Sequence, residues 1–290
     1  MELGTYQQRV ATTDQRAGEA STDAVVHFLG LAGEAGSVAA EYKKYLRDGA
    51  AHTWWKPRVR EELGDVLWYV ASICNHLHLD LNEIADANLH KAKDRWIAAD
   101  PTALDAEWPD EERLPRSGSY ELRPITDSRG RSVVELYFDG AKVGDPLTDA
   151  STIDDGYRFH DAFHISYAAL LGWSPVTRAL LGRKRRSNPV VDENEDGGRA
   201  IVIEEGVAAL VFGYATQHEL LDGVTRLDQK LLDTIAMVTS PLEVGSRPAA
   251  SWERAILTGF RIFRSLQENN GGFIDFDSDA STMTFRPRSR

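Results

Sequence analysis

The chain has 290 residues, 42% hydrophobic and 27% charged, a composition that suits two soluble globular domains or one elaborated domain. The formal net charge of −12 argues against duplex nucleic acid as a partner, because proteins that bind duplexes are normally basic. No apolar run approaches the roughly 18 residues that span a bilayer, and residues 1–15 lack the pattern of a signal peptide, so we expect no membrane partner and a cytoplasmic location.

Residues 1–99 have the pattern of an all-helical first domain. Apolar side chains recur at helical spacing in a segment that ends near Lys44, in a second from about Arg58 to His78, and in a third from Leu81 to Trp96. Short stretches with Gly, Asp or Pro separate these segments. We therefore predict consecutive helices throughout this part of the chain.

Residues 100–150 change character. Prolines, a glycine and an acidic cluster make residues 100–119 a predicted linker. Within residues 120–150, the β-rich run Val133–Phe138 is followed by Asp139-Gly140 and a second short run. An Asp-Gly pair between such runs is a strong hairpin signal, so this segment is predicted to form a small β-hairpin.

Residues 151–290 return to helical spacing and are predicted to form a helical C-terminal domain. The tail after Gly271 is expected to be irregular. Four consecutive basic residues at 183–186 either dock a phosphate or form a solvated loop. The expected fold class is mainly α: a helical bundle, a small β-hairpin and a second helical domain. The expected helices of that domain cover about residues 157–171, 175–182, 201–218 and 251–267.

Three acidic residues border apolar stripes on two helices of the first domain. Glu62 and Asp65 are one turn apart on one helix, beside a stripe that includes Leu63 and Val66. Glu34 lies in another helix, among glycines and alanines. Burying a carboxylate is costly unless it is paired or binds a metal, so the pattern favours a cation held by these acids. Oxygen ligands with no cysteine nearby suit Mg²⁺, or Mn²⁺, better than zinc.

The same acids admit a plainer explanation. Glu61 and Glu62 fall in the first turn of their helix, where acidic side chains interact favourably with the helix dipole whether or not a metal binds. The spacing alone leaves both explanations open.

The segments around these acids resemble the MazG-like nucleotide pyrophosphohydrolases. That family carries an ExxE motif on one helix and ExxD on the next, and Glu62-Leu63-Gly64-Asp65 is an intact ExxD. The run from Asn88 to Trp96 also resembles the family's third helix. The resemblance covers residues 5–97 and implies a MazG-like helical bundle for this part of the chain.

The resemblance implies Mg²⁺-dependent hydrolysis of a nucleoside triphosphate to the monophosphate and pyrophosphate. Glu34, Glu62 and Asp65 would be the catalytic residues and the metal ligands. One departure is plain: serine replaces the second acid of ExxE, so one metal position is altered or filled through water. The additional metal-ligand candidates are Ser37, Glu41 and Glu61.

The resemblance also bears on substrate and partners. Asn88, Lys91 and Arg95 stand where the family's third helix meets the polyphosphate, and the plainer alternative is ordinary surface charge. Three helices are too few to close both a core and a nucleotide pocket, and the family usually supplies the other walls from a second copy. We therefore expect a homo-oligomer, a dimer or higher, unless the second half of the chain supplies those walls.

A second group of ionisable residues lies in the expected C-terminal helices. Its histidines are four residues apart, a spacing that can chelate a metal. Residues 201–215 resemble a relaxed copy of residues 60–71 in which Ala208 replaces Asp65, so the second domain is a candidate diverged repeat. We expect a polar network between two helices here, with contacts such as Glu205 to His164, rather than the main catalytic site. The members of this secondary candidate site are His160, Asp161, His164, Glu204 and Glu205.

Two alternative functions remain open. The chain is a non-catalytic nucleotide-sensing or partner-binding protein if Ser37, in place of an acid, reflects the loss of catalytic activity. It is a metal-dependent phosphohydrolase with its site in the C-terminal half if the second group carries the reaction.

Overall fold

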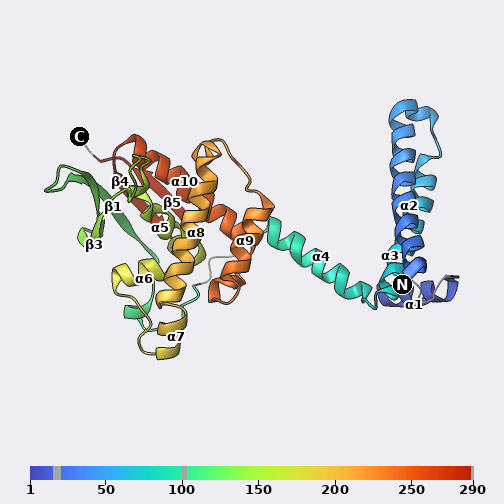
Figure 1. Cartoon of the computed structure of the whole chain (residues 1–290), viewed down its shortest axis with the longest axis horizontal. Helices are drawn as coiled ribbons and strands as arrows, with labels where there is room; N and C mark the ends of the chain where they lie inside the picture. Colours follow the sequence, from blue (N-terminus) through green and yellow to red (C-terminus); the bar gives the residue numbers. More distant parts are fainter. Residues whose placement is uncertain (16–20, 100–102, 289–290) are drawn as a thin grey trace. The chain divides into compact units, whose positions relative to one another are not determined.

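The computed structural model describes residues 1–15, 21–99 and 103–288, and the chain divides into two compact units (Figure 1). The first unit covers Met1–Ala92 and the second covers Lys93–Arg290. Most of the regular structure is helical, which confirms a mainly α chain. Among the described helices, none combines the length and the apolar character needed to cross a bilayer.

The first unit consists of helices. Helix α2 lies along α3, and α1 packs against α3. Helix α4 continues past the boundary into the second unit, and Leu81 is its one buried residue among those described. The bounds are α1 (Leu3–Thr13), α2 (Ser21–Asp48), α3 (Trp55–His76) and α4 (Leu81–Trp96).

Small and polar side chains fix the packing of α1, α2 and α3. A methyl group at Gly30 would lie 2.2 Å from the ring of Tyr69, so a glycine is needed where α2 passes α3. The Asp14 carboxylate, just after α1, lies 3.1 Å from Nε2 of His27 on α2 and accepts a hydrogen bond from Ser72 on α3. One buried carboxylate therefore joins three helices.

The second unit contains a five-stranded antiparallel sheet in the order β3-β2-β1-β4-β5. The central strand β1 pairs with β2 on one side and β4 on the other, so Tyr120 faces Phe138 and Ile274. The strands are β1 (Ser117–Thr126), β2 (Ser132–Phe138), β3 (Ala141–Leu147), β4 (Gly272–Asp277) and β5 (Thr282–Arg286).

The predicted hairpin is confirmed as β2 and β3. Its turn residues Asp139 and Gly140 have φ values of 45° and 85°, and positive φ at both positions is the requirement of a type I′ turn. The hairpin is not an isolated segment, however, because it forms two of the five strands of a larger sheet.

Two expectations for this region are wrong. The tail after Gly271 is regular: it forms β4 and β5, in which Ile274 is fully buried. The segment expected as a linker packs into the second unit through buried Asp105 and Leu114, and β1 begins at Ser117. Residues 100–102 of that segment lie outside the described residues. Both errors arise because short strands paired with distant partners leave little local pattern.

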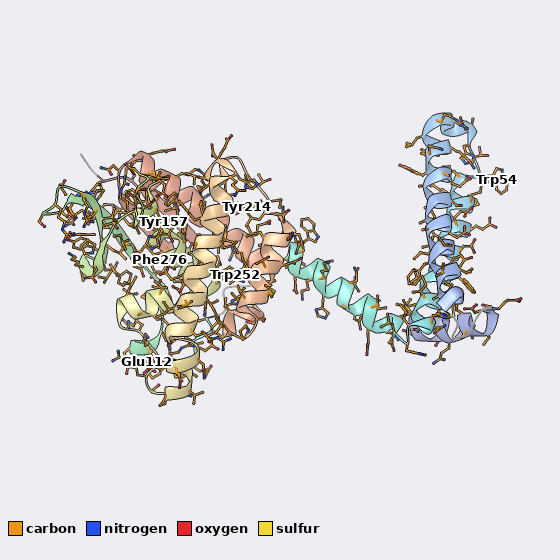
Figure 2. The ribbon with its side chains drawn as sticks, viewed as in Figure 1. Trp54, Glu112, Tyr157, Tyr214, Trp252 and Phe276 are labelled. Carbon is orange, nitrogen blue, oxygen red and sulfur yellow. The ribbon has the colours of Figure 1, made fainter. Side chains whose placement is uncertain are left out.

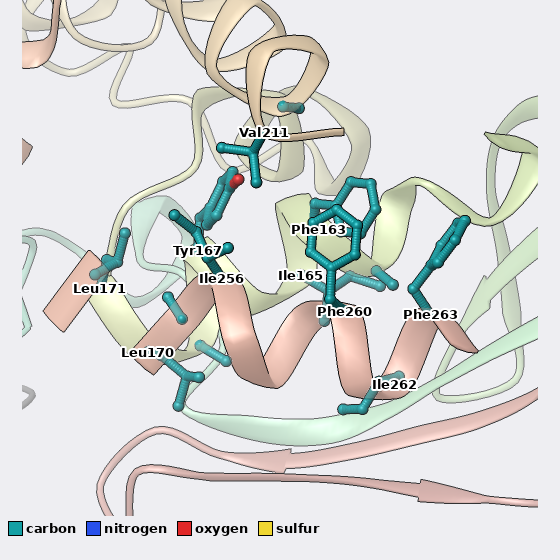
Figure 3. Close-up of a cluster of buried hydrophobic side chains, with 14 of the residues drawn as sticks. Phe163, Ile165, Tyr167, Leu170, Leu171, Val211, Ile256, Phe260, Ile262 and Phe263 are labelled. Carbon is teal, nitrogen blue, oxygen red and sulfur yellow. The ribbon is translucent and has the colours of Figure 1, made fainter. Parts of the chain in front are cut away.

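The helices of the second unit build one extensive core. Phe163 on α5 stacks on Phe260 of α10 with ring centroids 4.4 Å apart, and Phe263 packs beside them (Figure 3). Helices α5 and α10 also contact β5 of the sheet. The predicted helices are confirmed, and α7 and α9 are additional. The bounds are α5 (Asp161–Leu171), α6 (Pro175–Leu181), α7 (Pro189–Asn194), α8 (Gly198–Thr216), α9 (Gln229–Thr239) and α10 (Ala249–Glu268).

Candidate functional site

Helices α2 and α3 bring three carboxylates together in the first unit. Glu34 projects from α2, and Glu62 and Asp65 project from α3, one turn apart. One ligand oxygen from each lies within 4.8 Å of the others. Glu34 and Glu62 are half-buried and Asp65 is exposed, so the group is open to solvent on one side. We call these three residues the acid cluster.

The carboxylates of the acid cluster repel one another. The pKa of Glu62 is raised, first by partial desolvation and then by the adjacent Glu34, which shares a hydrogen bond with it and repels its charge. Asp65 adds further repulsion. A divalent cation would relieve this repulsion, and a donor set made only of carboxylate oxygens suits Mg²⁺ or Mn²⁺. The residues therefore fit the metal that the sequence suggested.

The other proposed metal ligands differ in their surroundings. Glu41 on α2 is buried, and both of its carboxylate oxygens have partners. One oxygen accepts a hydrogen bond from Lys44, and the other lies 3.1 Å from Nε2 of His52. The pKa of Glu41 is lowered, mainly by the hydrogen bond from Lys44. Glu61 is exposed on α3, and Ser37 is half-buried one turn beyond Glu34. Glu41 is thus already neutralised by Lys44 and does not need a metal.

The three predicted substrate-binding residues on α4 fall into two groups. Asn88 and Lys91 are exposed, and neither forms a hydrogen bond or ion pair within the part of the chain that the structure describes. Arg95 belongs to the second unit: its guanidinium lies 3.1 Å from the carboxylate of Glu253 and donates to the carbonyl of Leu227. Arg95 is therefore already paired, whereas Lys91 is available to a ligand.

The second unit gathers the other predicted group at the start of α5. Ligand atoms of His160, Asp161 and His164 lie within 4.8 Å of one another, and we call these three residues the His-Asp cluster. Asp161 and His164 are buried, and His160 is half-buried. Burial raises the pKa of Asp161, an effect that the two neighbouring histidines partly offset.

Helix α8 places Glu204 and Glu205 against His164. Nδ1 of His164 is 2.8 Å from Oε1 of Glu204, and Nε2 is 3.6 Å from Oε2 of Glu205. The expected contact between α5 and α8 is therefore present, although Glu204 is the closer partner. Burial lowers the pKa of His164, but the attraction of Glu204 outweighs it and raises the pKa to about 10.

The anchoring of Glu204 could not be predicted from the sequence. Its carboxylate also accepts hydrogen bonds from the Ser174 hydroxyl, 2.6 Å away, and from the backbone N–H of Val176, 2.8 Å away. Ser174 is the N-cap of α6, before a proline at the first helical position. No local signal links that cap to a carboxylate thirty residues later. Glu204 is thus held rigidly behind the His-Asp cluster.

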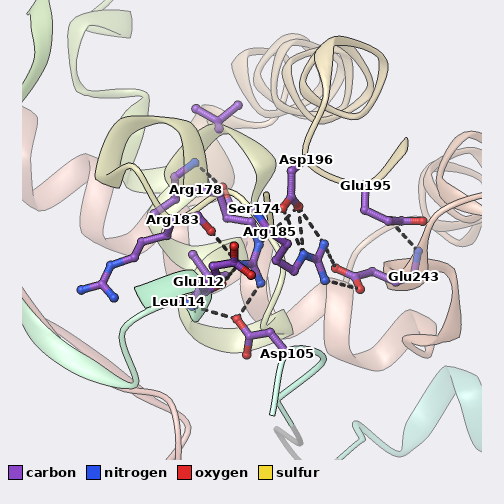
Figure 4. A network of polar contacts seen from close by, with 12 residues as sticks. Asp105, Glu112, Leu114, Ser174, Arg178, Arg183, Arg185, Glu195, Asp196 and Glu243 are labelled. Carbon is purple, nitrogen blue, oxygen red and sulfur yellow. Dashed lines mark hydrogen bonds and ion pairs between the residues drawn. The ribbon is translucent and has the colours of Figure 1, made fainter. Parts of the chain in front are cut away.

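The basic stretch at 183–186 is only partly available for an anion. Arg185 is buried and forms ion pairs with Asp196 at 2.7 Å and with Glu243 at 2.8 Å (Figure 4). Next to it, buried Arg178 pairs with Asp105 at 2.6 Å. Arg185 is therefore a structural residue, which contradicts its assignment to a solvated or phosphate-docking loop.

Comparison with known proteins divides the chain close to the boundary between the two units. The model of the MazG nucleotide pyrophosphohydrolase domain matches residues 27–96, and the model of the MazG C-terminal domain matches residues 99–289. The Gene 37 protein of Mycobacterium phage L5 is 42% identical over 69 residues, which are 23% of this chain and 60% of that protein. No solved structure matches the chain. The chain therefore belongs to the MazG family and carries both its nucleotide pyrophosphohydrolase domain and its C-terminal domain.

Proposed function

We propose that the acid cluster hydrolyses a nucleoside triphosphate to the monophosphate and pyrophosphate, in a reaction that depends on Mg²⁺. One observation carries the proposal: Glu34, Glu62 and Asp65 place ligand oxygens within 4.8 Å of one another inside the segment that matches the pyrophosphohydrolase domain.

The acid cluster would hold Mg²⁺, or Mn²⁺, through its carboxylate oxygens. When bound, the metal would neutralise the triphosphate, polarise the α-phosphate and lower the pKa of the attacking water. Without a cation the three carboxylates would repel so anionic a substrate. Metal binding and substrate binding are therefore expected to be coupled.

The proposed reaction transfers the α-phosphoryl group to water. The water oxygen forms a bond to the α-phosphorus, and the bridging bond between the α- and β-phosphates breaks. Pyrophosphate leaves with the electron pair of that bond, and the proton of the water passes to a carboxylate. Glu62 is the proposed acceptor, directly or through a second water, because desolvation and then the neighbouring Glu34 raise its pKa.

Substrate binding is proposed to use the exposed residues of α4. Lys91 offers a cation without an ion-pair partner among the described residues, and Asn88 offers an amide one turn earlier. Arg95 is the weaker candidate, because a polyphosphate would have to compete with Glu253 for its guanidinium.

We propose further that the first unit self-associates. Its α2 and α3 leave large apolar side chains in water, among them Leu29, which is 68% exposed, and Leu63, which is 51% exposed. Apolar side chains at such density on two neighbouring helices mark an interaction surface. A second copy of the chain is the proposed occupant of this surface. A Cβ atom added at Gly33 or Gly36 would meet no atom within 4 Å, so a helix of the second copy has room to approach α2 at these glycines.

The decisive experiment follows pyrophosphate release by the purified full chain. A panel of canonical and modified nucleoside triphosphates is incubated with Mg²⁺, and pyrophosphate and monophosphate are quantified together. Equal amounts of both products are expected from at least one substrate, with loss of activity in EDTA. Glu62→Gln should abolish turnover, whereas Glu61→Gln, one position away and outside the acid cluster, should retain it. Equal turnover by the two variants would contradict the proposed site.

A second candidate function rests on Ser37. This serine occupies the position of the second acid of ExxE, where a neutral hydroxyl is a weaker metal ligand than a carboxylate. The alternative is therefore a nucleotide sensor that binds its ligand and does not turn it over. Saturable nucleotide binding without product formation across the whole panel would favour the sensor.

A further inference from the structure

A buried ring nitrogen of the second unit lacks a hydrogen bond. His164 on α5 is 1% exposed, and its Nε2 atom forms no hydrogen bond within the described residues. The nearest carboxylate, that of Glu205, lies 3.6 Å away, which is too long for a hydrogen bond. Buried polar atoms in native proteins are normally satisfied, so an orphaned one indicates an additional ligand.

The opposite side of the same ring is firmly held. Nδ1 of His164 lies 2.8 Å from Glu204, which is itself fixed by Ser174 and the backbone of α6. A carboxylate can only accept a hydrogen bond, so Nδ1 is the ring nitrogen that donates to Glu204, and Nε2 is the nitrogen that a metal ion would bind in place of a proton. This arrangement, with one ring nitrogen donating to a carboxylate, is the one that orients histidines for metal ligation.

His160 repeats the arrangement one turn earlier. Its Nδ1 is 2.8 Å from the carbonyl oxygen of Tyr157, which again places the proton on Nδ1 and the lone pair on Nε2. The ring stacks on Tyr157 with centroids 4.3 Å apart, so its orientation is also fixed. Nε2 of His160 then lies 3.7 Å from Oδ1 of Asp161.

The charges around these two nitrogens are negative. Asp161 is 5% exposed, and no hydrogen bond to its carboxylate occurs in the described part of the chain. Glu204 and Glu205 add two more carboxylates, and no lysine or arginine among the described residues forms an ion pair with any of the three. Asp161 and Glu204 are thus buried carboxylates that no lysine or arginine among the described residues balances, and a bound metal ion would neutralise them.

We propose that the His-Asp cluster binds one divalent first-row transition metal ion, such as Zn²⁺, Mn²⁺ or Fe²⁺. Nε2 of His160, Nε2 of His164 and a carboxylate oxygen of Asp161 are the ligands. Two imidazoles select this class over Mg²⁺, which prefers oxygen ligands alone. The site is distinct from the acid cluster of the first unit and independent of the reaction proposed there.

Glu205 controls access to this metal. Its side chain is 45% exposed, so the carboxylate reaches both water and the neighbourhood of His164. It can serve as a fourth ligand or leave that position to a small molecule. The remaining positions around the ion therefore open toward solvent on the Glu205 side, as in sites that bind an exchangeable ligand.

The test measures bound metal on the full-length protein. Chelator-treated protein is dialysed to equilibrium against micromolar Zn²⁺ or Mn²⁺ with millimolar Mg²⁺ present, which keeps the acid cluster occupied. We expect one transition metal ion per chain for the wild type and for Glu62→Gln. His160→Gln should lose it, and the metal should raise the Tm of the wild type but not of this variant.

His218 provides a matched control. Like His160, it has Nδ1 within hydrogen-bonding distance of a tyrosine carbonyl, that of Tyr214 at 2.7 Å. Its ring also stacks on the ring of Tyr214, with centroids 4.1 Å apart. It is exposed and belongs to no group of metal-binding side chains in the described residues. His218→Gln should therefore retain the metal.

Two results would overturn the proposal. One is less than a tenth of an equivalent of transition metal on the folded wild type. The other is a full equivalent retained by His160→Gln. If that variant does not fold, Asp161→Asn takes its place, because a neutral isostere relieves a buried charge and should fold. Retention of the metal by Asp161→Asn would then count against the site.

Discussion

The two units of the chain differ sharply in how they use apolar side chains. Among the described residues, the buried cluster of the first unit is small: Val10, Ala71, Cys74 and Leu81. The second unit has a continuous core that draws on its helices and its sheet. The tryptophans illustrate the contrast: Trp54 in the first unit is 70% exposed, and Trp252 in the second is 2% exposed (Figure 2).

This contrast bears on function. The second unit buries several of its ionisable groups in ion pairs with one another, as Arg185 with Asp196 shows. The first unit keeps Glu34, Glu62 and Asp65 near its surface, beside apolar side chains that lack a partner. An open, charged and incompletely packed unit is suited to completing its site with metal, substrate and a second protein surface. The second unit, in contrast, is stabilised by its own continuous core.

The largest expected effect is on catalysis in the first unit. Asp65→Ala should reduce pyrophosphate release by at least roughly a thousandfold, which is about 4 kcal/mol of transition-state stabilisation. The metal-free fold should persist, because removing Asp65 takes away one of three mutually repelling carboxylates. Steady-state kinetics with saturating Mg²⁺ and a thermal melt test both points. Normal turnover by the variant would mean that the site lies elsewhere.

A large loss of stability is expected in the second unit. Arg185→Met leaves Asp196 buried without its closest ion-pair partner, which should cost on the order of 3 kcal/mol and lower Tm by roughly 6 to 12 °C. Arg186→Ala, its exposed neighbour, should change stability by less than about 0.5 kcal/mol. Calorimetry of both variants measures the two Tm values. Similar Tm values would show that the Arg185 network contributes nothing.

A smaller loss is expected from His164→Ala. The change removes a hydrogen bond to Glu204 and leaves a buried cavity, so Tm should fall by an amount that corresponds to roughly 1–3 kcal/mol. Turnover per folded molecule should stay near the wild-type value, because the reaction is assigned to the first unit. An unchanged melting curve with turnover reduced a hundredfold would move the catalytic centre to the second unit.

The smallest expected effect concerns self-association. Light scattering at micromolar concentration should give the mass of a dimer or a larger oligomer. Leu29→Ser should weaken association by about 1 to 2 kcal/mol per copy, since it removes one apolar contact from the exposed face of α2. Met237→Ser is the control, because Met237 is equally exposed but lies on α9 of the second unit. A wild-type monomer would refute self-association.

The sequence predicted local features well. Helical spacing located α3 and the pair Glu62 and Asp65, since residues three apart on a helix share a face. The pattern of glycines and alanines around Glu34 added that residue on a different helix, and the resemblance to a family joined the three acids into one expected site. The turn at Asp139-Gly140 was predictable for the same local reason, because few residue pairs accept two positive φ values.

Features that depend on distant partners could not be predicted. Strand β4 has only six residues, and its alternating pattern gains meaning only beside β1. Arg185 does lie in a loop, as expected, but the side chain is buried and its environment is set by Asp196 and Glu243. Side-chain spacing along the chain carries no information about such pairings.

The position of β1 in the sheet also determines when the second unit can fold. Tyr120 pairs with Ile274, about 150 residues later in the chain, so the centre of the sheet closes only after nearly the whole unit has been synthesised. Until then, one edge of β1 offers unpaired backbone groups, which is the situation in which strands join the wrong partner. The helices of the first unit contact neighbours close in sequence and can form while translation continues. During synthesis, the nascent chain therefore carries a folded N-terminal helical unit ahead of a C-terminal unit that is still vulnerable to aggregation.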